Sequence, residues 1–215
     1  MANQDTAFGL RPIGLNGASV NSTGVTQYEI ATNETNVIYQ YSPVIPTSGG
    51  FIDIVGAANG GTVPFLGVLM GVEYVDSSSK KTVFKNYWPG SGSVSVDTNF
   101  PIKAFVADNP NQLFMVAADE SVTDRATAIA DVFKNCSLAN ATSGSTNTGN
   151  STAELDISTA ATTATLAMRI VGLSTDIANL DYDAAGTNFV VRFNFHFNSP
   201  AANSDSQTTA NSTGI

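Results

Sequence analysis

The chain has 215 residues and a formal net charge of −9, and only 13% of its residues are charged. This length fits one large β domain or two small ones, and it can bury a core without disulfides or metals. The acidic balance argues against binding to nucleic acids and to anionic membranes, because both surfaces repel a negatively charged protein. Asn, Ser, Thr and Gly take the place of the missing charges, and this composition favours strands over long exposed helices.

The first 24 residues are expected to form an extended N-terminal arm, because Asn, Gly, Ser and Thr dominate them and no amphipathic period is present. The exception is a group of five residues, Phe8, Leu10, Arg11, Pro12 and Ile13, in which all but the arginine are apolar. The proline fixes its own φ and extends the residue before it. Apolar side chains on an extended segment need a surface to cover them, either the protein's own core or a neighbouring subunit. These five residues are therefore the candidate interface with a neighbouring subunit.

Short strands are predicted over the next part of the chain. The most apolar run spans 63–75 and contains Gly67 and Gly71. Two glycines and a proline disfavour a buried helix here, and glycine inside a strand often indicates a bulge or a close backbone approach. Three further runs are short, rich in strand-forming residues and bounded by turn signals: 27–30, 37–41 and 51–55.

Two hairpins are predicted next. Residues 80–88 alternate polar and apolar side chains and end at Pro89, which indicates a solvated hairpin. The apolar runs 101–107 and 112–117 flank a four-residue stretch, Asp-Asn-Pro-Asn, that is typical of a turn. Their spacing predicts that the two runs pair with each other.

One short helix is predicted at about 123–134, where apolar residues recur at helical spacing. Ser121 and Thr123 are the candidate N-terminal caps. The Thr- and Ser-rich stretch 139–153 that follows is expected to be an exposed loop.

Two strands, at 165–171 and 188–197, are predicted to close the domain. In the second, the residues from Phe189 to Phe197 alternate between an aromatic face and a polar face, as in a half-buried strand. His196 falls on the polar face and is expected to be a surface or interface residue. The polar segment 198–215 reads as a C-terminal tail.

The fold class predicted from these elements is mainly β: an antiparallel barrel or sandwich with one short helix and an extended N-terminal arm. The β-rich domain is expected to span 25–197. A second interpretation divides it into two subdomains, with a break near residues 120–150.

Familiar catalytic chemistry has little raw material in this chain, which contains one histidine and one cysteine. A lone cysteine, Cys136, cannot form an intrachain disulfide and is expected to pack in a core. The sequence contains no phosphate-binding glycine loop and no cysteine pair for zinc. The chain is therefore predicted not to be an enzyme, and no cofactor or metal is expected.

Several stretches in a shared order resemble the head decoration, or cement, proteins of tailed bacteriophages, in particular those of marine phages. The opening MANQDTAFGLRPIGLNG carries the Met-Ala-Asn start and the Phe-Gly-Leu-Arg-Pro run of that family. The other similar stretches are FLGVLMGVEYVD at 65–76, NYWPGSGSV at 86–94, KAFVADNPNQLFMVAAD at 103–119, MRIVG at 168–172 and FVVRFNFHF at 189–197. The resemblance does not extend to 20–62 or to the tail.

The resemblance implies a structural virion protein, made in the host cytoplasm and bound to the outer surface of the capsid. Its implied partners are the major capsid protein and copies of itself, as a homotrimer, without nucleic acid or membrane. Two alternatives stay open: a tail, fibre or head–tail adaptor component, and a carbohydrate- or host-surface-binding module. If the arm docks on the shell, deleting residues 1–13 should remove capsid binding and leave a folded domain.

Overall fold

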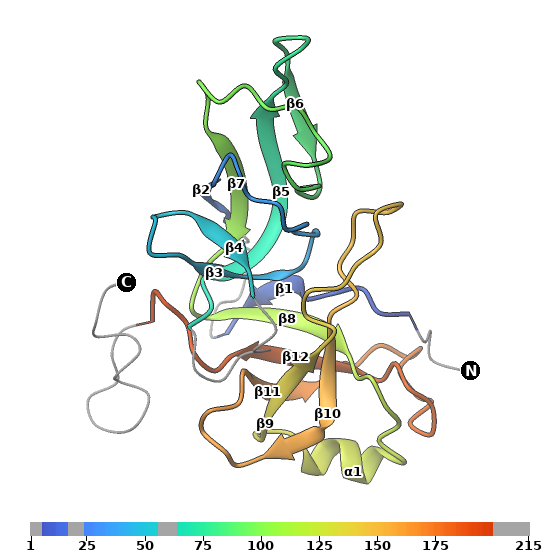
Figure 1. Ribbon diagram of the computed structural model, residues 1–215. Helices are drawn as coiled ribbons and strands as arrows, with labels where there is room; N and C mark the ends of the chain where they lie inside the picture. The colour runs from blue at the N-terminus through green and yellow to red at the C-terminus, as the bar shows by residue number, and fades with distance from the viewer. Residues whose placement is uncertain (1–5, 17–23, 56–63, 200–215) are drawn as a thin grey trace.

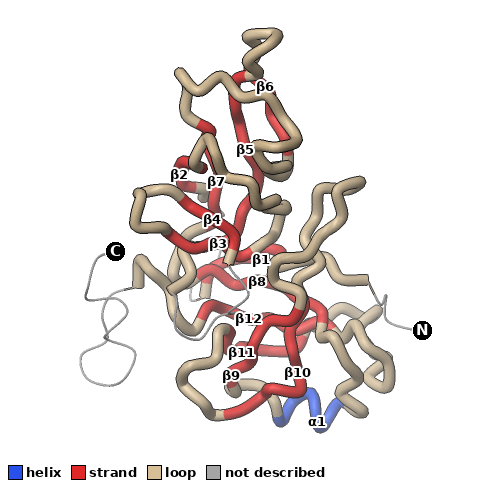
Figure 2. Tube along the Cα trace, viewed as in Figure 1, coloured by secondary structure: helices blue, strands red, loops and turns tan. Residues whose placement is uncertain are grey.

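The computed structural model describes residues 6–16, 24–55 and 64–199, and it is mainly β (Figure 1). Within these ranges the strands form two antiparallel sheets, and a single short helix, α1 (Arg125–Ala130), lies below them (Figure 2). The prediction of a mainly β antiparallel fold with one short helix is confirmed. Most of the predicted tail at 198–215, and residues 1–5 and 17–23 of the predicted arm, lie outside the described residues.

Sheet A forms the lower half of the molecule in Figure 1 and curls back toward itself. In spatial order its strands are β1 (Arg11–Leu15), β8 (Gln112–Ala117), β12 (Asn188–Phe193), β11 (Met168–Leu173), β9 (Asn135–Ala139) and β10 (Glu154–Ala161). Leu155 in β10 forms a parallel bridge with Ala118, the residue directly after β8, and the backbone N–H of Asp119 donates to its carbonyl at 3.1 Å. This curl brings β8 and β10, which are separated by three strands in the spatial order, together around one core.

Sheet B forms the upper half and is built around the long strand β5. Its strands, in spatial order, are β2 (Thr26–Ile30), β7 (Ile102–Ala107), β5 (Gly67–Val75), β3 (Pro43–Pro46) and β4 (Ile52–Ile54), with β6 (Thr82–Lys85) also paired to β5. The register of β5 against β7 shifts between Leu69 and Gly71. A Cβ on Gly67 would collide with the carbonyl oxygen of Ala107. The predicted bulge and close backbone approach are both confirmed. Within the predicted hairpin at 80–88, residues 82–85 form β6, whose partner is β5.

The predicted pairing of 101–107 with 112–117 is wrong. β7 belongs to sheet B, where it lies between β2 and β5, whereas β8 belongs to sheet A, where it lies between β1 and β12. Both edges of each strand are therefore filled by partners distant in the sequence, which bury more apolar surface than an isolated hairpin could. The chain passes from sheet A to sheet B between β1 and β2, and it returns to sheet A at 108–111, between β7 and β8.

The chain around 37–41 and 139–153 also differs from the sequence prediction. Instead of a strand, residues 37–41 make only isolated bridges, from Ile38 to Trp88 and from Gln40 to Asn150. The stretch 139–153 is not uniformly exposed, because this contact with Gln40 folds it against sheet B. Four of its residues are buried: Ala141, Gly149, Ser151 and Ala153.

Helix α1 is shorter than predicted and begins after Asp124. The Asp124 carboxylate accepts a hydrogen bond from the backbone N–H of Thr127 at 2.7 Å, so this residue, and not Ser121 or Thr123, is the N-terminal cap. The helix ends at Asp131, and Phe133 follows with a φ of 74°. This left-handed residue prevents the helix from continuing to the predicted end at 134.

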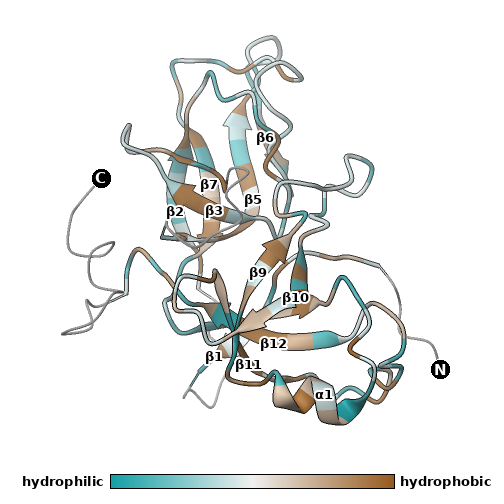
Figure 3. Ribbon diagram, turned by 60° about the horizontal axis from the view of Figure 1, so that its bottom comes forward, coloured by the Kyte–Doolittle hydropathy of each residue, from teal (hydrophilic) through white to brown (hydrophobic). Residues whose placement is uncertain are grey.

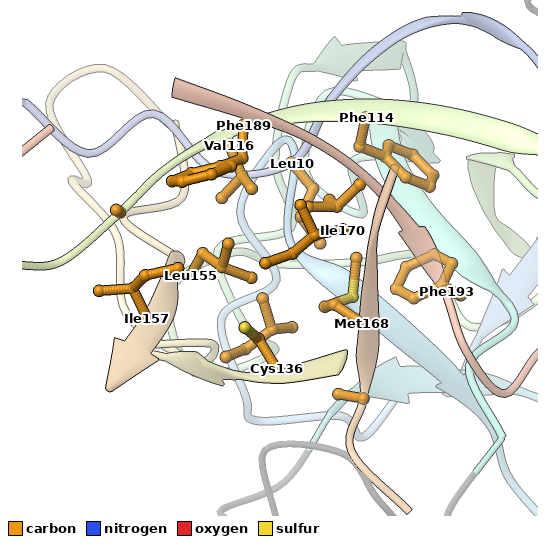
Figure 4. Packing of buried hydrophobic residues seen from close by; sticks show 14 of the residues in the cluster. Leu10, Phe114, Val116, Cys136, Leu155, Ile157, Met168, Ile170, Phe189 and Phe193 are labelled. Atoms are coloured by element: carbon orange, nitrogen blue, oxygen red, sulfur yellow. The ribbon is translucent and has the colours of Figure 1, made fainter. Parts of the chain in front are cut away.

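Each sheet has its own hydrophobic core. Figure 4 shows the core of sheet A, in which Phe189, Val191 and Phe193 are buried as their alternation predicts. The core of sheet B surrounds Trp88, whose indole N–H donates to the carbonyl of Glu34 at 3.2 Å. Both cores are thus closed by side chains from several strands.

Replacing Gly67 with alanine should destabilise the protein, because the new methyl group would overlap the backbone of β7. Overpacking of this kind costs about 1–3 kcal/mol. The matched control is Gly172→Ala in β11, where an added Cβ meets no atom within 4 Å. Urea denaturation of the two variants measures the difference. Equal midpoints for both would contradict the close approach of β5 to β7.

Candidate functional site

The described residues contain neither a metal-binding cluster nor an activated thiol. No group of three or more His, Cys, Asp or Glu side chains among them could hold a metal ion. Nor do the described helices include one with the length and apolar character needed to cross a bilayer. Cys136 is buried, and burial raises the pKa of its thiol to about 12, so it stays protonated and packs in the core of sheet A. The remaining candidates are surfaces that bind other molecules.

The structure separates the five residues predicted as an interface. Leu10 is fully buried in the core of sheet A (Figure 4), and its backbone N–H donates to the carbonyl of Tyr41 at 3.0 Å. Arg11 and Ile13 are exposed, whereas Phe8 and Pro12 are half-buried. The segment was expected to pack on the protein's own core or on a neighbouring subunit. For Leu10 it is the core, so this side chain is not available to a partner.

Arg11 remains as an outward-facing group on this edge of sheet A. Its guanidinium carbon lies 4.7 Å from the ring centre of Phe8 and 5.8 Å from that of Tyr41, within the range of a cation–π contact. Strand β1 pairs with β8, with Arg11 opposite Met115. The predicted extended arm is thus, over residues 11–15, an edge strand of the domain. Deleting residues 1–13 would remove core and edge together, so the expectation that this truncation leaves the fold intact is not supported.

The larger candidate surface is a groove between helix α1 and the loop after β11, which we call the α1 groove. Its volume is about 720 Å³. Figure 3 turns this end of the molecule toward the viewer. Large apolar side chains around it are exposed to solvent: Ile129 (43%), Phe133 (81%), Ile177 (80%) and Leu180 (58%). Sequence reasoning missed this surface because its two walls are about 45 residues apart and neither has a strong period.

Phe133 is held in an unfavourable conformation at the rim of the α1 groove. Its φ of 74° is rare for a bulky residue, and such backbone strain costs about 1–3 kcal/mol. The backbone N–H of Phe133 donates to the carbonyl of Ile170 at 2.9 Å, which fixes this geometry to β11. A strained aromatic side chain that is left in water contributes nothing to the core, and this combination is typical of a functional surface.

His196 is not the surface residue that the sequence predicts. It is only 3% exposed, because the segment after β12 folds back and bridges to Phe65. Its Nδ1 accepts a hydrogen bond from the backbone N–H of Asn198 at 3.1 Å, while its Nε2 has no partner in the described part of the chain. Burial lowers the pKa of His196 to about 4, and the nearby charge of Asp108 opposes this shift. The imidazole is therefore neutral at physiological pH.

Comparisons of the chain with family models, curated proteins and solved structures gave no match. Its function is accordingly argued from its own residues and from the resemblance of its motifs to the decoration proteins.

Truncating Leu10 should cost about 2–5 kcal/mol of stability, as expected for a large-to-small change in a closed core. Ile13 lies three residues further on, in β1, and is 39% exposed, so Ile13→Ala should cost less than about 1 kcal/mol. Chemical denaturation of both variants tests this difference. If Leu10→Ala is as mild as Ile13→Ala, the N-terminal segment does not belong to the core.

His196 should make the protein less stable in mild acid. Above a pH of about 6.5 the residue is neutral in both folded and unfolded chains. As the pH falls toward about 4, the unfolded chain takes up a proton that the folded chain excludes, so the free energy of unfolding decreases by on the order of 3 kcal/mol. Urea midpoints at neutral and acid pH should therefore differ less in His196→Gln than in the original protein. The same pH dependence in both would rule out this role.

Proposed function

We propose that this protein is a structural virion component that binds the outer surface of a phage capsid and adds contacts between major capsid proteins. The observation that carries the proposal is the α1 groove with its four exposed apolar side chains. The resemblance of the motifs at 65–76, 103–119 and 189–197 to decoration proteins supports the choice of partner.

The composition of the α1 groove supports binding to another protein. Soluble monomers rarely leave several large apolar side chains exposed together, and such patches are typical of interfaces. Aromatic anchors near the centre of an interface carry much of the binding energy. Phe133 is suited to this role because its backbone is fixed to β11 and its ring already faces solvent, so no core contact has to be broken when it binds a partner.

The charge of the chain supports a position outside the shell. A net charge of −9 repels packaged DNA, whereas an acidic exterior keeps a virion component soluble. The partners in this proposal are the major capsid protein and other copies of the chain, as a homotrimer. Neither contact requires a cofactor or an enzymatic step. Arg11 and Ile13 provide a second, smaller contact on the exposed edge of β1.

The position and copy number of the protein on purified particles test the proposed function. Cryo-electron microscopy should reveal its density over the junctions of the capsid lattice, at every capsomer. A single ring of copies at one vertex would instead support a tail or adaptor component. Absence from particles combined with binding to a glycan array would support the carbohydrate-binding alternative and overturn the proposal.

The role of the α1 groove is tested with Phe133→Gly. Glycine accepts a positive φ, so this variant should be as stable as the original chain or more stable. Its affinity for undecorated capsids should fall by at least about 30-fold, the loss expected for a hot-spot residue. Co-sedimentation with capsids measures this affinity.

The matched control is Phe84→Ala. Phe84 is 70% exposed on β6, in the other sheet, and lies outside the groove. It should lose no capsid binding. If Phe133→Gly binds as well as the original chain, or if Phe84→Ala shows the larger loss, the α1 groove is not the docking surface.

A further inference from the structure

Two arginines are directly opposite each other on the outer face of sheet A. Arg169 in β11 pairs in register with Arg192 in β12, between core-facing residues such as Ile170 and Val191. Like charges directly opposite each other on neighbouring strands are destabilising. The chain has 9 Lys and Arg against 18 Asp and Glu, so acidic partners are abundant, and this arrangement brings two of its few cations together instead.

Neither arginine is neutralised by the described residues. The ion pairs among them all involve lysines, at Lys80, Lys103 and Lys134. Arg169 donates from Nε to Oδ1 of Asn135 at 3.1 Å, which is a neutral partner. Burial, and then the charge of Arg192, lower the pKa of Arg169, but a guanidinium stays protonated at any physiological pH. Two half-buried positive charges are thus paired in register, and neither forms an ion pair with a described residue.

Both arginines line a pocket of about 460 Å³. Its other walls come from the turn between β7 and β8, at Asn111, and from the segment that ends β12, at Asn194 and His196. No carboxylate is among the described residues that line it. The pocket is therefore polar, positively charged and rich in N–H donors.

His196 adds an independent indication of a ligand. It is 97% buried, since only 3% of its surface is exposed, and its Nε2 has no hydrogen-bond partner in the described chain. Because Nδ1 accepts from Asn198, the ring hydrogen is on Nε2, which is a donor. Buried donors normally have an acceptor, so an unsatisfied donor that lines the same pocket as two arginines without ion pairs among the described residues calls for an explanation.

We infer that this pocket, which we call the arginine pocket, is a binding site for an oxyanion of the carboxylate or phosphate type. The planar guanidinium groups match the paired oxygens of such anions and bind them with two parallel hydrogen bonds. The anion supplies the missing counter-charge and relieves the repulsion between Arg169 and Arg192. Its source is either a free small anion or an acidic side chain of a partner protein. The inference does not depend on the proposed capsid role.

The experiment titrates the full-length protein with inorganic phosphate and, separately, with glutarate, at constant ionic strength maintained with sodium chloride. Backbone amide shifts in NMR spectra and the melting temperature are followed. Binding should saturate in the millimolar range, and the melting temperature should rise with the anion but not with chloride. A preference for phosphate indicates a free anion, and a preference for glutarate indicates a partner's carboxylate; either supports the site. No saturation with either anion would overturn it.

The variant Arg192→Gln should lose this response. In low-salt buffer without added anion it should also melt at a higher temperature than the original chain, because the repulsion is gone. Arg192→Lys keeps the charge and the fold but loses the planar fork, and it should bind the anion at least about tenfold more weakly.

The control for charge is Lys81→Gln, which removes one positive charge from the exposed hairpin of sheet B. It should respond to phosphate as the original chain does. If Arg192→Gln responds normally, or if Lys81→Gln loses the response equally, the effect is general screening of charge and the inference is wrong.

Discussion

The contact on which both halves of the molecule depend is made by Phe65. Its ring stacks on Phe193 of sheet A, with centres 4.6 Å apart, although Phe65 itself lies two residues before β5 of sheet B. Its backbone N–H donates to the carbonyl of Phe195, and its carbonyl accepts from the N–H of Phe197. A fully buried side chain with both backbone groups satisfied joins the start of the central strand of one sheet to the end of the strand in the other.

A second junction near this contact fixes the place where the chain changes sheet. Asp108, in the link from β7 to β8, accepts hydrogen bonds from the hydroxyls of Tyr28 at 2.7 Å and Thr26 at 2.8 Å. The same carboxylate accepts from the amide of Asn198 at 3.4 Å. Burial, followed by the hydrogen bond to Asp108, raises the pKa of Tyr28 to about 12. These bonds tie β2, the link and the segment after β12 together, and they place His196 beside the arginine pocket.

The two candidate surfaces share a physical property: each contains an unfavourable feature that the folded chain does not compensate. At the α1 groove this is backbone strain and exposed apolar area around Phe133. At the arginine pocket it is the repulsion of Arg169 and Arg192 and the unsatisfied Nε2 of His196. A core built by several long-range strands can tolerate these costs, because each is small compared with the burial of a complete sheet. A partner that covers the apolar side chains or neutralises the arginines would relieve these costs, and this relief would favour binding.

Local pattern was sufficient for the β class, the bulged strand with Gly67 and Gly71, the alternating core face of β12 and the presence of one short helix, because period and composition act within a few residues. Local pattern did not predict which strands pair with β7 and β8, or that Leu10 and His196 are buried. It also did not predict the α1 groove or the opposed arginines. Each depends on which distant segment fills a strand edge or covers a face, and that competition is decided by the total apolar area buried. The sequence by itself thus determined the kinds of elements in this protein, and the tertiary structure alone decided which of their side chains are left for partners.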